Sequence, residues 1–580
     1  MDNRNIARLF HETAALLEVS AADPFRIRSY RRAAEALEQT AVPVAAIADQ
    51  PKELLAIPGI GKGMAANIAE IAATGKLGVR EELLAKYRPS MLELLRLPGM
   101  GPKTVALIWE ALQICEIDAL EAAAKAGHLT ALPRMGAKQV EKLLKSIEDY
   151  RRHAGRFRLS EADETAERLT AYLLQLPGIE RVTPAGSLRR GREVVGDLDL
   201  LVTGPACEEE TASATADYVA AFAGISDLIG KGKNKVSFKM HTGMQVDVRL
   251  LPEASFGAAL QYFTGSKSHN VTLRQRAMRM GYTLNEYALA RLDDGSVTVP
   301  VTDEAQVYAT LGLDWIPPEL REGSGEFEAA VNHTLPRLIE MADIRGDVHV
   351  HTDATDGRNT IREMAEAAVE LGYKYIAITD HSKNLAMTNG LDDARALAHM
   401  ARVQAVDREM EGRIRIFTGI EVDILGDGSL DLSDEVLAQM DVVIGSVHSL
   451  FNQPRQQMTD RMLRAVENPY LRIVGHMTGR LLLRREGYEI DVEAVVRRCG
   501  ELGVAVEHNA SPERLDLCDV DLKLAKQHGC KIVINTDAHS TRDFNKLKYG
   551  VAQLRRAWLT PADVLNTREP LEFLAGLRPR

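Results

Sequence analysis

The sequence has few cysteines, no paired CxxC motif and no long apolar run. Its five cysteines are scattered over 580 residues, without the spacing of a disulfide framework or of a thiolate zinc site. The first residues, MDNRNIARLFHETAALLEV, give the pattern of an amphipathic helix broken by charges, and no apolar stretch approaches membrane-spanning length. We therefore expect a protein of the reducing cytoplasm, neither secreted nor embedded in a membrane.

The chain as a whole also has no excess of positive charge. The formal net charge is -11, which argues against a nucleic acid partner if charge is averaged over the molecule. Binding depends on local patches, however. Between Asp227 and Arg279 nine Lys/Arg residues stand against three Asp/Glu residues, so a polyanionic partner stays in consideration.

The first third of the chain is helical by periodicity and contains a repeat. LLAIPGIGKGMAANIAEI (54–71) returns as LLRLPGMGPKTVALIWEAL (94–112) and more faintly as LTALPRMGAKQVEKLLKSI (129–147). Each copy predicts a helix, a tight glycine turn and a second helix. An ordinary helical hairpin would explain one copy, but repetition indicates a dedicated function.

A chain of this length is expected to form about three to five domains. After the helical first third, two further sequence patterns follow. Short β-rich runs mix with helices up to about residue 320, which is typical of an α+β domain. Beyond 346 short apolar strands alternate with helices, as in a β/α barrel or an open parallel sheet. We predict helical regions at 1–90 and 91–157, an α+β domain at 158–320, a linker at 321–345 and a β/α domain at 346–580.

The stretch AGSLRRGREVVGDLDLLV (185–202) carries two carboxylates at alternate positions of a predicted strand. Asp197 and Asp199 would share one face, and QVDVRL supplies a third carboxylate, Asp247, on a second strand. Three carboxylates at one point repel each other unless divalent cations neutralise them, and oxygen ligands suit Mg²⁺. Two such ions about 4 Å apart would serve a phosphoryl transfer.

Ahead of these carboxylates, Gly186 and Ser187 precede the fixed charges of Arg189 and Arg190, which suit a triphosphate. The simpler alternative is a surface strand edge whose arginines are the partners of its aspartates. We favour the metal site because the Gly-Ser prefix, the arginines and the third aspartate occur together.

Together these motifs resemble those of the family X DNA polymerases, the group that contains DNA polymerase beta. The resemblance rests on Gly186-Ser187-x-x-Arg190, Gly196-Asp197-x-Asp199, Asp247-x-Arg249, YFTGSKSHN and LNEY. It implies a nucleotidyltransferase palm with a nucleotide-selecting subdomain, in which Asp197, Asp199 and Asp247 are catalytic and bind Mg²⁺. It implies dNTPs and gapped or nicked double-stranded DNA as partners. It assigns nucleotide contacts to Gly186, Ser187, Arg190, Gly196, Arg249, Tyr262, Phe263, Gly265 and Asn270, and DNA contacts to Lys235 and Arg274.

The glycine repeats resemble helix-hairpin-helix motifs, whose exposed N–H groups bind DNA phosphates without reading sequence. Their turn residues are Gly59, Gly61, Gly99 and Gly101, whereas the third copy has Arg134 where glycine is expected.

Relatives with lyase activity use a lysine where this chain has Asn67, and an amide cannot form a Schiff base. Arg26, Tyr30 and Arg32 would still make a 5′-phosphate pocket. We therefore predict gap-end binding without strong lyase activity.

In the last segment potential metal ligands follow successive strands. The functional ends of barrel strands are their C-terminal ends, so these residues would converge on one mouth. Mixed imidazoles and carboxylates favour Zn²⁺, Mn²⁺ or Fe over Mg²⁺ alone. A lone histidine is more often structural, but six at successive strand ends are hard to explain that way.

This segment resembles the polymerase and histidinol phosphatase (PHP) domain, a seven-stranded β/α barrel with a trinuclear centre of Mn²⁺ or Zn²⁺. The resemblance assigns nine ligands, namely His349, His351, Asp356, His381, Glu421, His448, His476, Asp537 and His539. In bacterial chains that join both parts, it implies a 3′→5′ exonuclease that processes 3′ ends or abasic sites.

We therefore predict a monomeric repair polymerase that fills short gaps and carries a metal-dependent nuclease. One alternative is a scaffold that binds gapped DNA ends and whose barrel holds only structural metal. Another, ranked last, is a small-molecule phosphatase fused to a nucleotidyltransferase, because the hairpins and the basic palm have no role in it.

Overall fold

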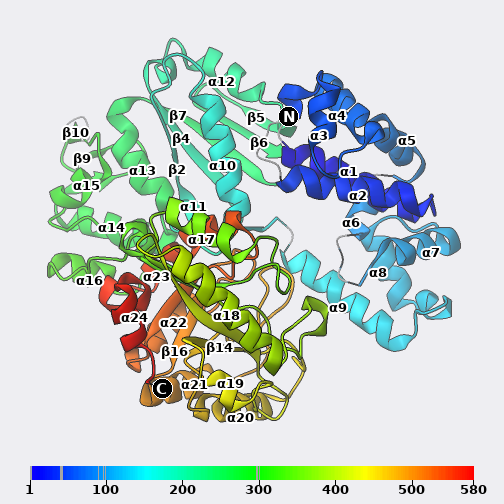
Figure 1. Ribbon diagram of the computed structural model, residues 1–580. Coiled ribbons are helices and arrows are strands. Elements are labelled where there is room, and N and C mark those ends of the chain that lie inside the picture. The colour runs from blue at the N-terminus through cyan, green and yellow to red at the C-terminus, as the bar shows by residue number, and fades with distance from the viewer. Residues whose placement is uncertain are drawn as a thin grey trace. The chain divides into compact units, whose positions relative to one another are not determined.

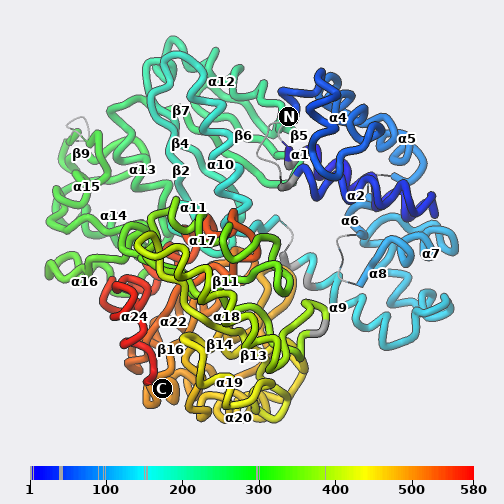
Figure 2. The backbone as a smooth tube through the Cα atoms, viewed as in Figure 1, coloured from blue at the N-terminus to red at the C-terminus, as the bar shows by residue number. Residues whose placement is uncertain are grey.

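The computed structural model describes residues 3–39, 44–88, 90–95, 97, 99–153, 155–294, 298–299 and 301–579. They form two compact units, residues 1–154 and 155–580, which we treat separately (Figures 1 and 2). Within these described ranges, no helix combines the length and the apolar character needed to cross a membrane.

The first unit consists of helices around two apolar cores. One core gathers α1 (Asn3–Val19), α2 (Pro24–Gln39), α3 (Pro51–Ala56), α4 (Lys62–Thr74) and α5 (Gly78–Lys86). The other is formed chiefly by α6 (Met91–Leu94), α7 (Pro102–Leu112), α8 (Ile117–Lys125) and α9 (Ala137–His153). Short 3₁₀ turns lie at Val44–Ile47 and His128–Ala131.

The second unit begins with a domain that we call the palm. Its five-stranded sheet has the order β2-β4-β7-β6-β5, in which only β4 and β7 are parallel. Helices α10 and α12 cross one face of this sheet (Figure 1). The elements are β1 (Phe157–Arg158), α10 (Leu159–Leu173), β2 (Arg181–Pro184), α11 (Gly186–Arg189), β3 (Val194–Val195), β4 (Asp197–Thr203), α12 (Ala212–Ala220), β5 (Ile225–Lys231), β6 (Lys235–Met240) and β7 (Gln245–Leu251).

A small helical domain with a three-stranded antiparallel sheet, order β10-β9-β8, follows the palm. Its own apolar core includes Leu273, Val307 and Tyr308. The elements are α13 (Phe256–Thr264), α14 (Lys267–Arg279), β8 (Tyr282–Leu284), β9 (Leu289–Arg291), β10 (Thr298–Val299), α15 (Glu304–Thr310) and α16 (Glu326–Val331).

The last domain is a nearly closed parallel barrel of seven strands in sequential order, which decides between the two predicted architectures in favour of the barrel. A parallel bridge between Val350 and Ala538 brings the first and last strands together. The strands are β11 (Gly346–Val350), β12 (Tyr375–Ile378), β13 (Arg415–Asp423), β14 (Val442–Ser446), β15 (Ile473–Val474), β16 (Ala505–Asn509) and β17 (Ile532–Asn535). The helices are α17 (Ile361–Glu370), α18 (Asp393–Glu409), α19 (Asp434–Leu437), α20 (Arg455–Glu467), α21 (Val492–Leu502), α22 (Asp519–Gln527), α23 (Leu547–Arg556) and α24 (Pro570–Gly576).

Candidate active sites

Strands β4 and β7 place three carboxylates on one face of the palm sheet. Along β4, Asp197 is exposed and Asp199 is half-buried, whereas Leu198 and Leu200 are fully buried on the opposite face. Asp199 pairs with Asp247 in the parallel ladder, so their side chains project from the same face. The structure thus brings the three predicted carboxylates together.

These carboxylates carry more negative charge than their neighbours neutralise. Burial, and then the charge of Asp197, raise the pKa of Asp199 to about 6. Lys235 Nζ lies 2.7 Å from Asp247 Oδ2, and Arg249 Nε lies 4.0 Å from Asp199 Oδ1. Asp247 Oδ1 is buried and has no hydrogen-bond partner among the described residues. A set of oxygen donors with spare negative charge fits divalent cations such as Mg²⁺.

The segment of residues 186–192 approaches this site closely; it consists of the short helix α11 and the turn after it, and we call it the 186–192 loop. Gly186 has a φ of +60°, and a Cβ atom there would lie 3.0 Å from Asp199 Oδ2. Glycine therefore permits both the turn and the close approach of the carboxylate. Ser187 is half-buried beside it, and Gly196, just before β4, is exposed.

The two neighbouring arginines of this loop have different environments. Arg189 points inward and donates to Thr264 Oγ1 at 2.6 Å and to both carboxylate oxygens of Glu304 at 2.8 Å. Arg190 donates from Nε to Glu322 at 3.1 Å and from Nη1 to the carbonyl of Thr264. The sequence suggested two similar charges for a triphosphate, and in the structure each guanidinium pairs with a carboxylate: Arg189 shares Glu304 with Arg321, and Arg190 pairs with Glu322.

Helix α13 ends in the predicted aromatic pair. The Tyr262 and Phe263 rings lie 5.1 Å apart, and the Arg249 guanidinium carbon lies 3.9 Å from the centre of the Phe263 ring. A Cβ atom at Gly265 would lie 3.1 Å from Arg190 Nη1, so the turn after α13 borders the 186–192 loop.

Helix α14 carries the two remaining predicted contacts of this region. Asn270 donates to the Tyr262 carbonyl at 2.7 Å and accepts from Gln261 at 2.8 Å, whereas Arg274 is exposed. Lys235, predicted to contact the DNA backbone, lies against Asp247 in this structure.

The barrel gathers its predicted ligands at the C-terminal ends of its strands. Seven of the nine form three overlapping groups, and within each group the ligand atoms lie within 4.8 Å of one another; His476 and Asp537 lie beside these groups. The groups are His351, Asp356, His381 and His539; His349, His351 and Glu421; and His381, Glu421 and His448. Sequence positions almost 200 residues apart therefore converge, as the barrel topology requires.

Glu421 lies at the centre of the cluster. Its carboxylate oxygens lie 2.8 Å from His381 Nδ1, 3.0 Å from His476 Nε2 and 3.4 Å from His448 Nε2. Burial opposes its ionisation, but the surrounding histidines hold its pKa well below the usual range. A buried carboxylate among imidazoles is a donor set that binds Mn²⁺ or Zn²⁺.

Asp537 and His351 form the other half of the cluster. Asp537 Oδ1 lies 3.1 Å from His351 Nε2 and 3.6 Å from His349 Nε2. Burial, and then His539 and His381, lower the pKa of His351 to about 4, so its ring is neutral and able to bind a cation. Buried nitrogens of His349, His351 and His476 lack hydrogen-bond partners within the described part of the chain, which fits metal ligation.

The cluster opens to solvent at one side. The side chains of Asp356 and His539 are 30% and 34% exposed, and Asp356 Oδ2 lies 3.4 Å from His539 Nε2. The other histidines of the cluster are largely buried, so a phosphoester would reach the site past these two residues.

Two carboxylates behind the cluster orient its histidines. Glu507 Oε1 lies 2.7 Å from His349 Nδ1, so Glu507 orients a predicted ligand. Asp423 Oδ1 lies 3.1 Å from His448 Nδ1, and sequence reasoning missed it. The available signal was its position two residues after Glu421 on one strand, which places both on the same face.

Two arginines near the barrel mouth have different partners. Arg480 donates to Glu193 of the palm at 2.7 Å and to the Arg514 carbonyl at 3.0 Å. Arg514 Nε lies 3.7 Å from Asp537 Oδ2. Arg514 is therefore the better placed of the two to contact a phosphate at the barrel mouth.

The glycine hairpins of the first unit have the expected local geometry. Gly59 and Gly99 have φ angles of +99° and +83°, and Gly61 and Gly101 directly precede α4 and α7. In the third copy Arg134 takes the positive φ, at +66°. A non-glycine residue there is strained by about 1 kcal/mol or more.

The predicted gap-end residues lie on α2, next to the first hairpin. Arg26 and Arg32 are exposed, whereas Tyr30 is buried and packs edge-on against Phe10. Asn67 donates to the Tyr30 hydroxyl at 2.9 Å. Position 67 thus faces α2, where its amide serves a structural hydrogen bond.

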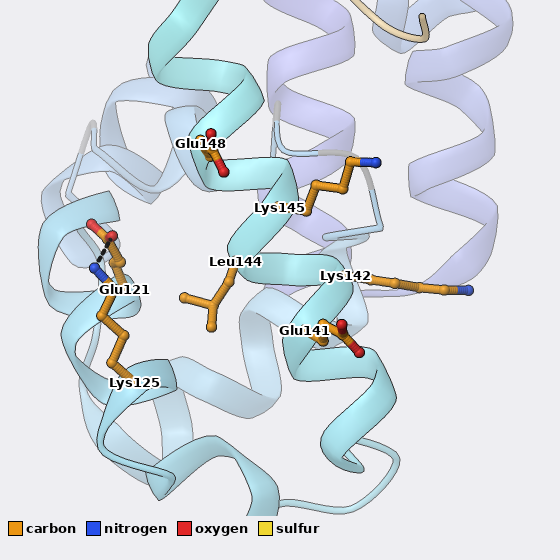
Figure 3. A pocket seen from close by; sticks show the side chains of 7 residues that line it. All are labelled: Glu121, Lys125, Glu141, Lys142, Leu144, Lys145 and Glu148. Atoms are coloured by element: carbon orange, nitrogen blue, oxygen red, sulfur yellow. Dashed lines mark ion pairs between the residues drawn. The ribbon is translucent and has the colours of Figure 1, made fainter. Parts of the chain in front are cut away.

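A surface groove of about 670 Å³ runs between α8 and α9 (Figure 3). Its described lining alternates acidic and basic side chains and includes no predicted site residue. The lining residues are Glu121, Lys125, Glu141, Lys142, Leu144, Lys145 and Glu148.

The second unit therefore has two candidate metal sites, one suited to nucleotidyl transfer and one to phosphoester hydrolysis. Family models match in four places: a helix-hairpin-helix domain (1–77), a SAM-like helix-hairpin-helix tandem (91–149), the DNA polymerase beta thumb (259–322) and the PHP domain (347–511).

Relatives match both the whole chain and the barrel alone. The chain is 37% identical over 583 residues to the DNA polymerase/3′-5′ exonuclease PolX of Bacillus subtilis, covering 100% of each chain. A probable phosphatase of Caldicellulosiruptor saccharolyticus is 32% identical over 241 residues, 40% of this chain and 95% of the relative. The solved structure of Leishmania infantum polymerase beta in a ternary complex covers 40% of this chain and 98% of its own, with 22% identity and a TM-score of 0.27. On the full-length relative, the chain belongs to the family X DNA polymerases with a C-terminal PHP domain.

Proposed function

We propose that the chain fills short gaps in DNA by template-directed addition of dNTPs and removes nucleotides or blocks from 3′ ends through the barrel. The observation that carries this proposal is the presence of both sites in one chain, the carboxylates of β4 and β7 beside Arg190 and the ligand cluster around Glu421. The Bacillus subtilis relative, which matches over the full length, is named as a polymerase and 3′-5′ exonuclease.

In the palm, Asp197 and Asp199 would hold two Mg²⁺ ions and Asp247 would hold the one beside the primer 3′-hydroxyl. Bound Mg²⁺ supplies a lower pKa for the attacking hydroxyl and neutralises charge on the leaving pyrophosphate. Ser187 and Arg190 would bind the triphosphate from the 186–192 loop, close to the carboxylates. Tyr262, Phe263 and Gly265 would line the sugar, Asn270 would contact the nascent base pair and Arg274 the template strand.

In the barrel, the cluster would hold Mn²⁺ or Zn²⁺ in up to three positions, matching its three groups of ligand atoms. Such ions supply an activated water and absorb the charge that develops on a phosphodiester. Glu507 and Asp423 fix the ring orientations of His349 and His448, and Arg514 would bind the phosphate.

The hairpins and the exposed Arg26 and Arg32 would bind phosphates of gapped or nicked DNA, and Lys235 would do so from the palm. With Asn67 committed to Tyr30, we expect little lyase activity. We further propose that the chain acts as a monomer, with both reactions on one DNA end. Tethering two activities raises the effective concentration of one at the product of the other.

The test uses a single-nucleotide-gapped duplex with a labelled primer, in Mg²⁺ or Mn²⁺, with and without dNTPs. We expect extension with dNTPs and shortening without them. Asp197→Ala should remove only extension and His349→Ala only shortening. Binding without either reaction would support the end-binding scaffold instead, and preference for a small phosphate ester would support the phosphatase alternative.

The DNA-binding part of the proposal has a matched pair of variants. Gly59→Ala forces a φ of +99° and brings a Cβ to 3.1 Å from that of Ala36, whereas Gly230, on β5 of the palm, has nothing within 4 Å of such an atom. We expect Gly59→Ala to weaken gapped-DNA binding and Gly230→Ala to change it little, measured as Kd in Mg²⁺-free buffer. Equal affinities would contradict a role for the first hairpin turn.

A further inference from the structure

Helix α23 of the barrel contacts the 186–192 loop of the palm at the junction of the two domains (Figure 1). Gln553, a residue that is 1% exposed, donates from Nε2 to the Gly191 carbonyl at 2.6 Å. Gly191 has a φ of +63°, and a Cβ atom there would lie 3.1 Å from that of Ala552. The barrel thus packs directly against the backbone of this loop.

Arg556, at the end of α23, contacts the same loop through its guanidinium group. The residue is 4% exposed, and it donates from Nη1 to the Arg190 carbonyl at 3.0 Å and to Glu322 Oε1 at 2.9 Å. Its Nη2 lies 2.8 Å from Asp519 Oδ2. A buried guanidinium requires such partners, so its position is narrowly defined.

Glu322 connects this barrel arginine to the side chain of Arg190. The same oxygen, Oε1, accepts from Arg556 Nη1 and from Arg190 Nε at 3.1 Å. Burial opposes ionisation of Glu322, but Arg190 and Arg556 hold its pKa below the usual value. One ionised carboxylate therefore bridges the barrel and the arginine that faces Gly265.

A second contact from the barrel holds the segment that leads from the 186–192 loop into β4. Arg480 of the barrel donates to Glu193 at 2.7 Å, and Glu193 lies just before β3 and four residues before Asp197. The segment between Arg190 and Glu193 is thus fixed at both ends by the barrel.

We propose that Arg556 and Gln553 are positioning residues for DNA synthesis. They hold the backbone of the 186–192 loop and, through Glu322, orient the Arg190 guanidinium toward the incoming triphosphate. This inference rests on the proposed role of Arg190 in nucleotide binding. A guanidinium held in place before binding loses less conformational freedom on contact with phosphate, so the barrel lowers the KM for the dNTP.

The experiment measures steady-state extension of a single-nucleotide-gapped duplex by the full-length protein. For Arg556→Met we expect a KM for the dNTP about tenfold higher, with kcat changed less than about threefold. The Kd for gapped DNA and 3′-end hydrolysis should stay unchanged. Gln553→Leu should raise the same KM by a smaller factor, and it serves as the second variant if Arg556→Met does not fold.

Arg555→Met is the matched control. Arg555 lies on the same helix and pairs with Glu319 at 2.7 Å, away from the 186–192 loop, so its KM for the dNTP should stay at the wild-type value. An equal rise in Arg555→Met would mean that domain docking alone matters, which would overturn the inference.

Arg190→Met separates this inference from the proposed function. If Arg190→Met leaves the KM unchanged, the nucleotide role of Arg190 is wrong and the inference fails with it. If Arg190→Met raises the KM while Arg556→Met and Gln553→Leu do not, only the inference is overturned. The double variant Arg190→Met/Arg556→Met should have the same KM for the dNTP as Arg190→Met alone, because both residues act through one contact.

Discussion

The two candidate metal sites use different donors in different surroundings. In the palm, Asp197 is exposed and Asp199 half-buried, and the donors are carboxylates alone. In the barrel, Glu421 and the histidines His349 and His351 are buried almost completely. We therefore expect cations in the palm to exchange with solvent and to arrive with each nucleotide, whereas cations in the barrel stay resident between turnovers.

The two sites also differ in how the negative charge of their carboxylate ligands is stabilised. In the barrel the acidic ligands are surrounded by imidazoles, and the pKa values of Glu421 and Asp537 lie well below the usual range despite burial. In the palm, burial and a like charge raise the pKa of Asp199 to about 6. The acidic ligands of the barrel are thus ionised among their histidine neighbours, whereas the carboxylates of the palm repel one another until cations neutralise them.

The strongest test of this separation is Asp199→Asn. Extension should fall roughly a thousandfold, because a lost ligand removes several kcal/mol of charge stabilisation, while barrel hydrolysis stays unchanged. The measurement is single-turnover extension beside 3′-end hydrolysis of the same preparation. The control is Asp227→Asn, on exposed β5 of the same sheet. A parallel loss of hydrolysis would mean that the two sites are not separate.

The reciprocal test is Glu421→Gln in the barrel. Because Glu421 contacts His381, His448 and His476, we expect hydrolysis to fall at least about a hundredfold and bound Mn²⁺ or Zn²⁺ to decrease. Extension should stay intact. Bound metal is measured by elemental analysis of the purified protein, with the exposed Glu435→Gln as control. Full metal content in Glu421→Gln would refute the central position of this carboxylate.

Sequence patterns predicted the parts of both sites that follow from local periodicity. The alternation of side chains along a strand predicted that Asp197 and Asp199 share one face. The expected barrel topology predicted that ligands at the strand ends converge. The predicted fold class, helical hairpins followed by a polymerase palm and a PHP barrel, is confirmed.

What the sequence could not show are contacts between distant segments. Arg189 and Arg190 are neighbours with the same chemistry, and only the fold shows that one pairs with Glu304 and the other with Glu322. Arg480 lies on the same loop as the predicted ligand His476, yet its partner Glu193 lies 287 residues away in the sequence. Such pairings depend on how whole domains pack, which no local pattern encodes.

Chelation should separate the two sites by rate. After brief exposure to EDTA, extension should return as soon as Mg²⁺ is added, because Asp197 is exposed. Barrel hydrolysis should decay at least about tenfold more slowly in EDTA, since buried ligands release an ion only when the site opens. The two activities are followed in timed samples, with metal content as the second readout. Equal decay times would abolish the distinction between exchanging and resident cations.

The pH dependence of Mg²⁺ activation gives the finest comparison. Below a pKa of about 6 the Asp199 carboxyl is protonated and cannot bind a cation, and above it the carboxylate is available. The Mg²⁺ concentration for half-maximal extension should therefore rise up to about tenfold per pH unit below 6 and level off above it. DNA binding without Mg²⁺ over the same pH range is the control for unfolding. A flat Mg²⁺ requirement between pH 5 and 7 would mean that the palm carboxylates, like Glu421 and Asp537 of the barrel, are already ionised before cations bind.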